Sequence, residues 1–208
     1  MTCHAPGREL LRQAICYALP SADLVTPALL PRPTPCAAWN LGMLLSHLSE
    51  SLDALAEGLG QGEVLLAPAT LEPPGPLEPG AEPAGMRARC GRLLSAIAAA
   101  PAGRRVVIAG HDMTESVLTY TGAIEISVHG WDVAAACGRP RPIPDDLARP
   151  LLAVAPALVG GGAREGLFAE PLPAAPQARP GERLLSFLGR AGLRPLGPVR
   201  PRQAPSPG

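Results

Sequence analysis

A run of leucines at helical spacing is the feature that most constrains how this chain can fold. Asn40 is a favourable residue at a helix start, because its side chain can accept a hydrogen bond from a free backbone N–H of the first turn. The leucines after it lie along one helical face: Leu41, Leu44, Leu45, Leu48, Leu52, Leu55 and Leu59. The pattern predicts a long amphipathic helix whose apolar face must be covered by other helices.

Prolines and glycines separate this segment from others with the same period. The 27 prolines and 23 glycines gather between the periodic segments, where they end helices and form loops. We expect three more long helices, at residues 8–19, at residues 114–137 and, between residue 83 and Pro101, one with these residues inward: Met86, Cys90, Leu93, Leu94 and Ile97. Residues 60–83 are expected to form a proline-rich surface loop and residues 104–108 a short extended piece. Together these segments predict an all-α fold, a four-helix bundle.

The C-terminal part of the chain has weaker helical signals. Pro144, Asp145 and Asp146 are typical of a helix start, and Pro150 and Pro156 are expected to break the helix that follows. A short capping helix is expected at residues 181–190. Residues 195–208 cannot bury an apolar face and are predicted to be a disordered tail, which leaves residues 1–194 as the folded domain.

The composition excludes several classes of protein. With 47% hydrophobic residues, 208 residues are enough for one domain with a real core. The 18 basic residues, all arginine, balance 18 acidic ones, which argues against a nucleic-acid partner or an anionic membrane surface. No segment resembles a signal peptide or a membrane span, so the expected location is the cytoplasm. The cysteines lack Cys-x-x-Cys spacing and are expected to be reduced thiols: Cys3, Cys16, Cys36, Cys90 and Cys137.

Three residues on two of the expected helices form a candidate metal site. Glu125 and His129 lie four residues apart, about one helical turn, so both side chains project from one line of the helix at 114–137. His47 lies at the edge of the leucine stripe of the other helix and can supply a third ligand. Two histidines and one carboxylate are a ligand set that leaves a coordination position open in catalytic zinc sites.

The candidate ligands belong to a polar stripe with apolar residues on both sides. Thr121, Glu125, His129 and Asp132 share one line of the helix. Burying a carboxylate and an imidazole without partners is costly, and a divalent cation satisfies both. Asp132 is placed to accept the second ring proton of His129 and so to orient the ring. Spacing alone leaves the alternative open that Glu125 and His129 form a buried ion pair, His47 is a core histidine and Asp132 a surface residue.

Other reactive groups and metal patterns fit the sequence less well. The chain has no His-Glu-x-x-His motif and no paired Glu-x-x-His of a di-iron bundle. An iron oxygenase with two histidines and one carboxylate would have its ligands on strands, whereas these lie at helical spacing. His4 and His111 lie in loop-like sequence and are expected to be solvated, and no base adjacent to Cys36 marks it as a nucleophile.

Two blocks of the sequence resemble a known family. The first is Thr34-Pro35-Cys36-x-x-Trp39 with Leu44-Leu45-x-His47-Leu48, and the second is Glu125-x-x-x-His129-Gly130-Trp131-Asp132-Val133-Ala134. Both resemble the metal-binding members of the DinB/YfiT-like superfamily and, within it, the N-terminal domain of mycothiol-dependent maleylpyruvate isomerase. The resemblance covers residues 8–190 at the level of pattern. The chain departs from the full isomerase, and we expect a short form without the C-terminal α/β domain.

The resemblance implies a fold, a metal and a cosubstrate. It implies a four-helix bundle that holds a divalent ion, most simply Zn²⁺, through His47, Glu125 and His129, and in some relatives a low-molecular-weight thiol such as mycothiol. We therefore expect a metal-dependent, thiol-using transferase or isomerase that acts on a small electrophilic molecule. The alternative is a non-catalytic bundle with a structural or sensory metal site. The assembly, monomer or homodimer, stays open.

Overall fold

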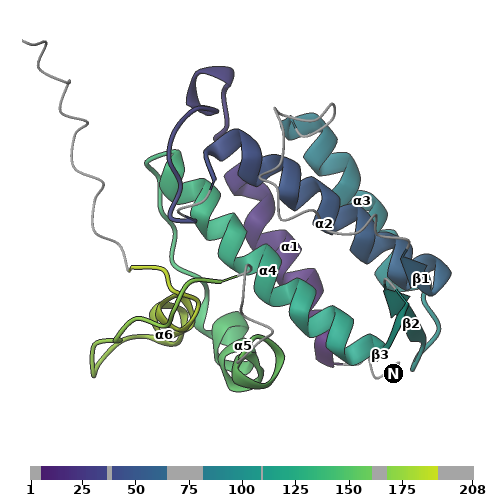
Figure 1. The fold of residues 1–208 in the computed structure, drawn as a ribbon. Helices are drawn as coiled ribbons and strands as arrows, with labels where there is room; N and C mark the ends of the chain where they lie inside the picture. Colours follow the sequence, from purple (N-terminus) through teal and green to yellow (C-terminus); the bar gives the residue numbers. More distant parts are fainter. Residues whose placement is uncertain (1–5, 37–38, 65–81, 109, 161–167, 192–208) are drawn as a thin grey trace, which may run out of the picture.

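Four long helices form the body of the protein in the computed structural model, which describes residues 6–36, 39–64, 82–108, 110–160 and 168–191 (Figure 1). These helices are α1 (Pro6–Ala22), α2 (Leu41–Gln61), α3 (Pro83–Ala99) and α4 (Glu115–Ala136). Helix α4 packs against α1 and α2, and α3 packs against the same two helices. The predicted all-α fold is therefore confirmed, and the ends of these helices lie within three residues of the predicted ends.

Smaller elements flank the bundle. A single 3-10 turn, Pro27–Leu29, lies before α2, and two further helices, α5 (Asp145–Leu158) and α6 (Pro180–Phe187), pack on each other beside α4. At one end of the bundle lies a small sheet of β1 (Glu63–Val64), β2 (Arg105–Ile108) and β3 (His111–Thr114). Strand β2 pairs parallel with β1 and antiparallel with β3. The extended piece at 104–108 is confirmed, whereas β1 and β3 are additions to the predicted fold.

The ends of α2 and α4 follow from their capping residues. The Asn40 side chain accepts a hydrogen bond from Met43 N at 2.9 Å, as its position before the leucine stripe predicts. At the other end of the bundle, the Thr114 hydroxyl accepts from Val117 N and begins α4. Gly138, with a φ of 74°, follows the last turn of α4, as expected for a helix exit. Helices α2 and α4 thus both begin at a capping side chain, and α4 ends before a glycine in the left-handed conformation.

The expectation that prolines break the C-terminal helix is wrong. Helix α5 continues through Pro150 and Pro156, and α1 likewise passes Pro20 before it ends. Pro20 and Pro156 lie on exposed faces, where water satisfies the carbonyl groups that lose a donor. The opposite face of α5 stays buried and holds the helix together: Leu147, Ala148, Leu151 and Ala155.

Several predicted features fall on residues outside the described part of the chain. They are the predicted tail at 195–208, residues 65–81 of the predicted loop, His4 and Cys3.

None of the described helices combines the length and apolar character needed to cross a membrane. The described cysteines form no disulfide with one another: Cys16, Cys36, Cys90 and Cys137.

Helix α4 approaches its neighbours closely at two glycines. A Cβ atom at Gly122 would lie 2.6 Å from Leu55 Cδ2 on α2, and one at Gly130 would lie 2.6 Å from Ala18 Cβ on α1. Larger side chains at these positions would push the helices apart, because packed interiors have little room to adjust. The two glycines therefore set how closely α4 lies against the helices that share its core.

A buried ion pair joins α1, the end of α3 and the start of α4. Arg8 and Glu115 are both buried, and Arg8 Nη2 lies 2.9 Å from Glu115 Oε2. Arg8 also donates hydrogen bonds to the carbonyl oxygens of Ile97, Ala100 and Pro101. The hydrogen bond from Arg8 lowers the pKa of Glu115, against the opposing effect of burial. The carboxylate is therefore ionised and paired in the folded protein.

We predict that Glu115→Gln lowers the free energy of unfolding at neutral pH by about 3 kcal/mol. This is the lower end of the range for breaking a buried ion pair, since nearby carbonyl groups still accept hydrogen bonds from Arg8. Because the folded-state pKa of Glu115 is lowered, its contribution is complete above the ordinary carboxylate range and is lost as the pH falls through the folded-state pKa. Urea unfolding of both proteins between about pH 7 and about pH 3 measures the difference.

The control for this prediction is Asp112→Asn, which removes the exposed ion pair with Arg105 between β2 and β3. Exposed pairs contribute little, so its unfolding midpoint should stay close to that of the wild type. A similar loss of stability in both variants, or a loss in Glu115→Gln that is independent of pH, would contradict the account.

Candidate metal centre

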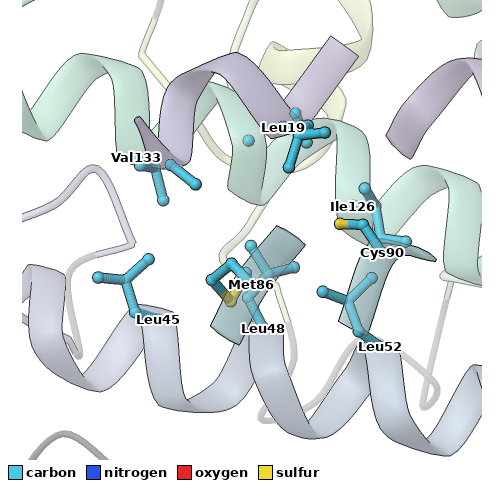
Figure 2. Close-up of a pocket in the computed structure, with 11 residues that line it drawn as sticks. Leu19, Leu45, Leu48, Leu52, Met86, Cys90, Ile126 and Val133 are labelled. Carbon is cyan, nitrogen blue, oxygen red and sulfur yellow. The ribbon is translucent and has the colours of Figure 1, made fainter. Parts of the chain in front are cut away.

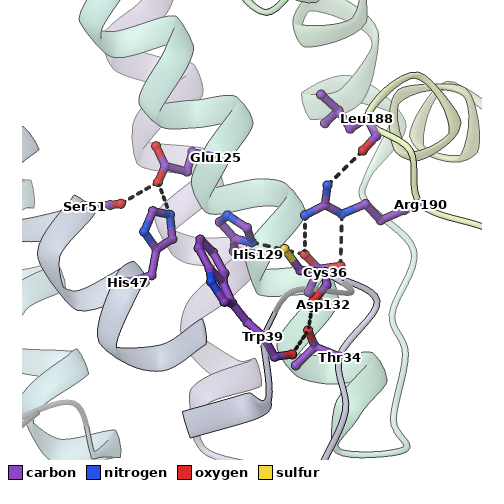
Figure 3. Close-up of polar contacts among 10 residues, drawn as sticks. All are labelled: Thr34, Cys36, Trp39, His47, Ser51, Glu125, His129, Asp132, Leu188 and Arg190. Atoms are coloured by element: carbon purple, nitrogen blue, oxygen red, sulfur yellow. Dashed lines mark hydrogen bonds and ion pairs between the residues drawn. The ribbon is translucent and has the colours of Figure 1, made fainter. Parts of the chain in front are cut away.

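The candidate ligands meet where α2 faces α4 (Figure 3). His47 comes from α2, and Glu125 and His129 come from successive turns of α4. Each offers one ligand atom, and these three atoms all lie within 4.8 Å of one another. The structure thus brings together the three candidate ligands indicated by the sequence, one on α2 and two on α4.

The site has a buried end and an open end. The side chain of His129 is 3% exposed, whereas those of His47 and Glu125 are each 24% exposed. The sequence pattern predicted a buried polar stripe, and Glu125 is partly rather than completely buried. Among the described residues, the exposed parts of His47 and Glu125 form the side of the cluster that solvent reaches.

Glu125 is held by two residues of α2. His47 Nε2 lies 2.9 Å from Glu125 Oε1, and the Ser51 hydroxyl donates a hydrogen bond to the same oxygen. Burial, the largest effect, raises the pKa of Glu125, but the hydrogen bond and charge of His47, with smaller effects of His129 and Ser51, lower it to about 2. The alternative ion pair between Glu125 and His129 is therefore not what forms, because the partner of Glu125 is His47.

His129 is held from its other side by Asp132. His129 Nδ1 lies 3.1 Å from Asp132 Oδ2, and the Asp132 side chain is fully buried, so Asp132 is not a surface residue. Burial lowers the pKa of His129 more than the hydrogen bond and charge of Asp132 raise it, which keeps the ring neutral at neutral pH. A carboxylate only accepts hydrogen bonds, so the neutral ring carries its proton on Nδ1 and keeps the Nε2 lone pair free.

The donor set fits a divalent transition metal such as zinc. Zinc binds histidine nitrogen and carboxylate oxygen at about 2.0–2.2 Å in tetrahedral geometry, so two ligand atoms of one ion lie roughly 3.3–3.6 Å apart. The three candidate atoms lie within 4.8 Å of one another, so the side chains would draw together around a bound ion. Three protein ligands also leave a fourth position for water or a substrate atom.

Trp39 covers part of the site from the loop before α2. Its ring centroid lies 4.4 Å from that of His47 and 5.9 Å from that of His129. The Thr34 hydroxyl lies within hydrogen-bond distance of the carbonyl oxygens of Cys36 and Trp39, at 2.9 Å and 2.8 Å. These contacts tie the backbone of Cys36 and Trp39 to Thr34, and the indole lies against the two histidines (Figure 3).

An apolar cavity lies in the bundle next to the site but does not belong to it (Figure 2). It has a volume of about 10 Å³, which is room for roughly one water molecule. Its walls are apolar side chains of α1, α2, α3 and α4, among them Leu19, Leu48, Met86 and Ile126. The cavity is too small for a substrate, so it is a packing gap in the core.

Other sequence candidates lie away from the cluster. His111 is exposed, as expected, but lies in strand β3 rather than in a loop. Sequence reasoning assigned no part in the site to Ser51, Trp39 or Arg190. Ser51 lies one helical turn after His47 on α2, so its place beside Glu125 follows from the same spacing rule. Arg190 lies 58 residues from its partner Asp132, and no local pattern joins the two.

Comparisons with known proteins place the chain in a family. The family model of the mycothiol maleylpyruvate isomerase N-terminal domain matches residues 18–134, a span that contains the three candidate ligands and Asp132 and ends before Arg190. Uncharacterized proteins from two Mycobacterium tuberculosis strains, CDC 1551 and H37Rv, are each 30% identical over 165 residues, which covers 76% of this chain and 83% of each relative. No solved structure matches the chain. The chain therefore belongs to the family of the mycothiol maleylpyruvate isomerase N-terminal domain.

Proposed function

We propose that this protein binds one divalent metal ion, most simply Zn²⁺, and uses it with a low-molecular-weight thiol of the mycothiol type. The reaction is a transfer or isomerisation of a small electrophilic molecule. One observation carries the proposal: two histidines and one carboxylate, from two different helices, converge at a site that is open on one side. Membership of a family named after a mycothiol-dependent isomerase supports the thiol.

The ligand residues are prepared for this role by their surroundings. His47, Glu125 and His129 would hold the ion, which when bound would lower the pKa of a coordinated thiol and so supply a thiolate. Glu125 is ionised and His129 is neutral in the folded protein, which are the protonation states of metal ligands. Asp132 holds the proton on His129 Nδ1, so that Nε2 is the nitrogen left for a ligand bond.

Two further residues shape the approach to the site. Ser51 orients the Glu125 carboxylate by a hydrogen bond from α2. Trp39 lies against both histidine rings, at an interplanar angle of 43° to each, and limits the space on that side of the site. The partly exposed edge formed by His47 and Glu125 leaves the path by which a thiol or a small electrophile would reach the site.

A structural or sensory metal site is the alternative function. The same three ligands would serve it, and the partial cover by Trp39 is the observation that favours it, because a shielded ion exchanges ligands slowly. The two functions differ in the fourth coordination position. An exchangeable position supports the thiol-using enzyme, and a position filled by a fourth protein ligand supports the structural or sensory site.

We predict that the purified protein, reconstituted with Zn²⁺ and desalted, retains about one ion per chain. His47→Ala and His129→Ala should each abolish this binding, because two remaining ligands hold zinc weakly. His111→Ala is the matched control, since this histidine is exposed on β3, and it should retain the metal. Elemental analysis measures the zinc content of the wild type and of each variant. Retention near one equivalent in His47→Ala or His129→Ala would show that the ligands are others.

A thiol titration of the cobalt-substituted protein tests whether the fourth coordination position of the metal ion is exchangeable. Addition of a small intracellular thiol should produce a sulfur-to-metal charge-transfer band, because thiolate replaces the bound water. The test uses a variant with Cys36→Ser and Cys137→Ser, since these partly exposed thiols would mimic the signal. A spectrum that is indifferent to thiol at about millimolar concentration would rule out the thiol mechanism and favour the structural or sensory site.

A further inference from the structure

A buried arginine contacts the carboxylate that holds His129. Arg190 follows α6 and is 2% exposed. Its Nη2 donates a hydrogen bond to Asp132 Oδ2 at 3.0 Å, and its Nε lies 3.4 Å from Asp132 Oδ1 (Figure 3). Asp132 Oδ2 is also the atom 3.1 Å from His129 Nδ1. A continuous series of contacts therefore runs from the C-terminal segment to a candidate metal ligand.

The C-terminal segment holds Arg190 in place by contacts of its own. Arg190 Nη1 donates to the carbonyl oxygen of Leu188, and its backbone N–H donates to the carbonyl oxygen of Leu185. The guanidinium carbon lies 5.6 Å from the centre of the Phe168 ring, in cation–π range. These contacts fix the position and the plane of the guanidinium that pairs with Asp132.

The two-point contact matters because Asp132 is fully buried. In the described part of the chain, its carboxylate has two hydrogen-bond partners, Arg190 and His129. A guanidinium that contacts both carboxylate oxygens fixes the plane of the group, which one hydrogen bond to a ring does not. With the plane fixed, Asp132 Oδ2 fixes both the ring orientation of His129 and the nitrogen that carries its proton.

We propose that Arg190 is a positioning residue for the metal ligand His129 and acts through Asp132. The proposal rests on the proposed metal-binding function and deepens it. The side-chain hydrogen bonds of Arg190 go to Asp132 and to the carbonyl oxygen of Leu188, and its route to His129 is through Asp132. Its contribution is that His129 presents Nε2, in a single orientation, to the point where His47 and Glu125 meet.

The test compares Arg190→Met with Arg183→Met. Methionine keeps most of the apolar stem and removes the donors and the charge. Arg183 is exposed on α6, the helix that precedes Arg190, so its replacement makes the same change of charge without touching Asp132. The first readout is the Zn²⁺ dissociation constant by competition with a chelator. We expect Arg190→Met to bind roughly 10–100-fold more weakly, the range for loss of a residue that orients a ligand, and Arg183→Met to bind like the wild type.

The second readout is the ring tautomer of His129 in the metal-free protein, by nitrogen-15 NMR. The wild type and Arg183→Met should show a protonated Nδ1 and an unprotonated Nε2, and Arg190→Met should lose this single pattern. Weaker zinc binding with an unchanged tautomer would overturn the positioning role and leave Arg190 as part of the fold. Unchanged binding and tautomer would overturn it as well.

A milder variant keeps the test decisive if Arg190→Met does not fold. Arg190→Lys retains the charge but loses the planar two-point contact, so it should fold and still weaken zinc binding, by less than methionine does. Wild-type binding and a wild-type tautomer in Arg190→Lys would overturn the proposal. Because the tautomer is measured without metal, it tests the action of Arg190 on His129 even if the wild type fails to bind zinc. That failure would contradict the proposed function alone.

Discussion

The structure depends on how α4 pairs the ionisable side chains that it carries through the interior. This helix is covered by α1, α2 and α5, so water reaches few of its groups, and its buried charged groups need partners from the chain. The Ser127 hydroxyl and Trp131 Nε1, also on α4, are buried without a hydrogen-bond partner among the described residues. Arg8 of α1 pairs with Glu115, His47 and Ser51 of α2 hold Glu125, and Arg190 pairs with Asp132. Each partner comes from a different part of the chain, so the polar groups of α4 help to determine which segments surround it.

These polar positions differ in what they can do chemically. Glu115 and Asp132 are paired with arginine, which stays protonated and does not bind metals, and both pairs are closed to solvent. Glu125 is paired instead with a histidine, and its edge is partly exposed. An imidazole can give up its proton and bind an ion together with the carboxylate. The middle position of α4 therefore combines the residue types and the access that a metal centre needs, while the other two serve the fold and the orientation of His129.

Most of the bundle could be predicted from the sequence, but only part of the candidate site could. The leucine stripe and Asn40 determine α2 because helical period and capping are local properties. Strand β1 has two residues, too few for a period to show, and prolines on the exposed faces of α1 and α5 are tolerated because burial of the opposite face decides the outcome. In the site, one-turn spacing indicated Glu125, His129 and Asp132. The pairing of Glu125 with His47, and of Asp132 with Arg190, depends on how distant segments pack, which no spacing rule contains.

We propose that one metal ion joins α2 to α4 at this cluster, and anomalous diffraction from crystals of the zinc-loaded protein would locate that ion. We predict one strong anomalous peak at about 2.0–2.2 Å from His47 Nε2, a Glu125 oxygen and His129 Nε2. The Nδ1 atom of His129 should still face Asp132. A zinc peak at another place, with the contact between His47 and Glu125 intact, would contradict the claim.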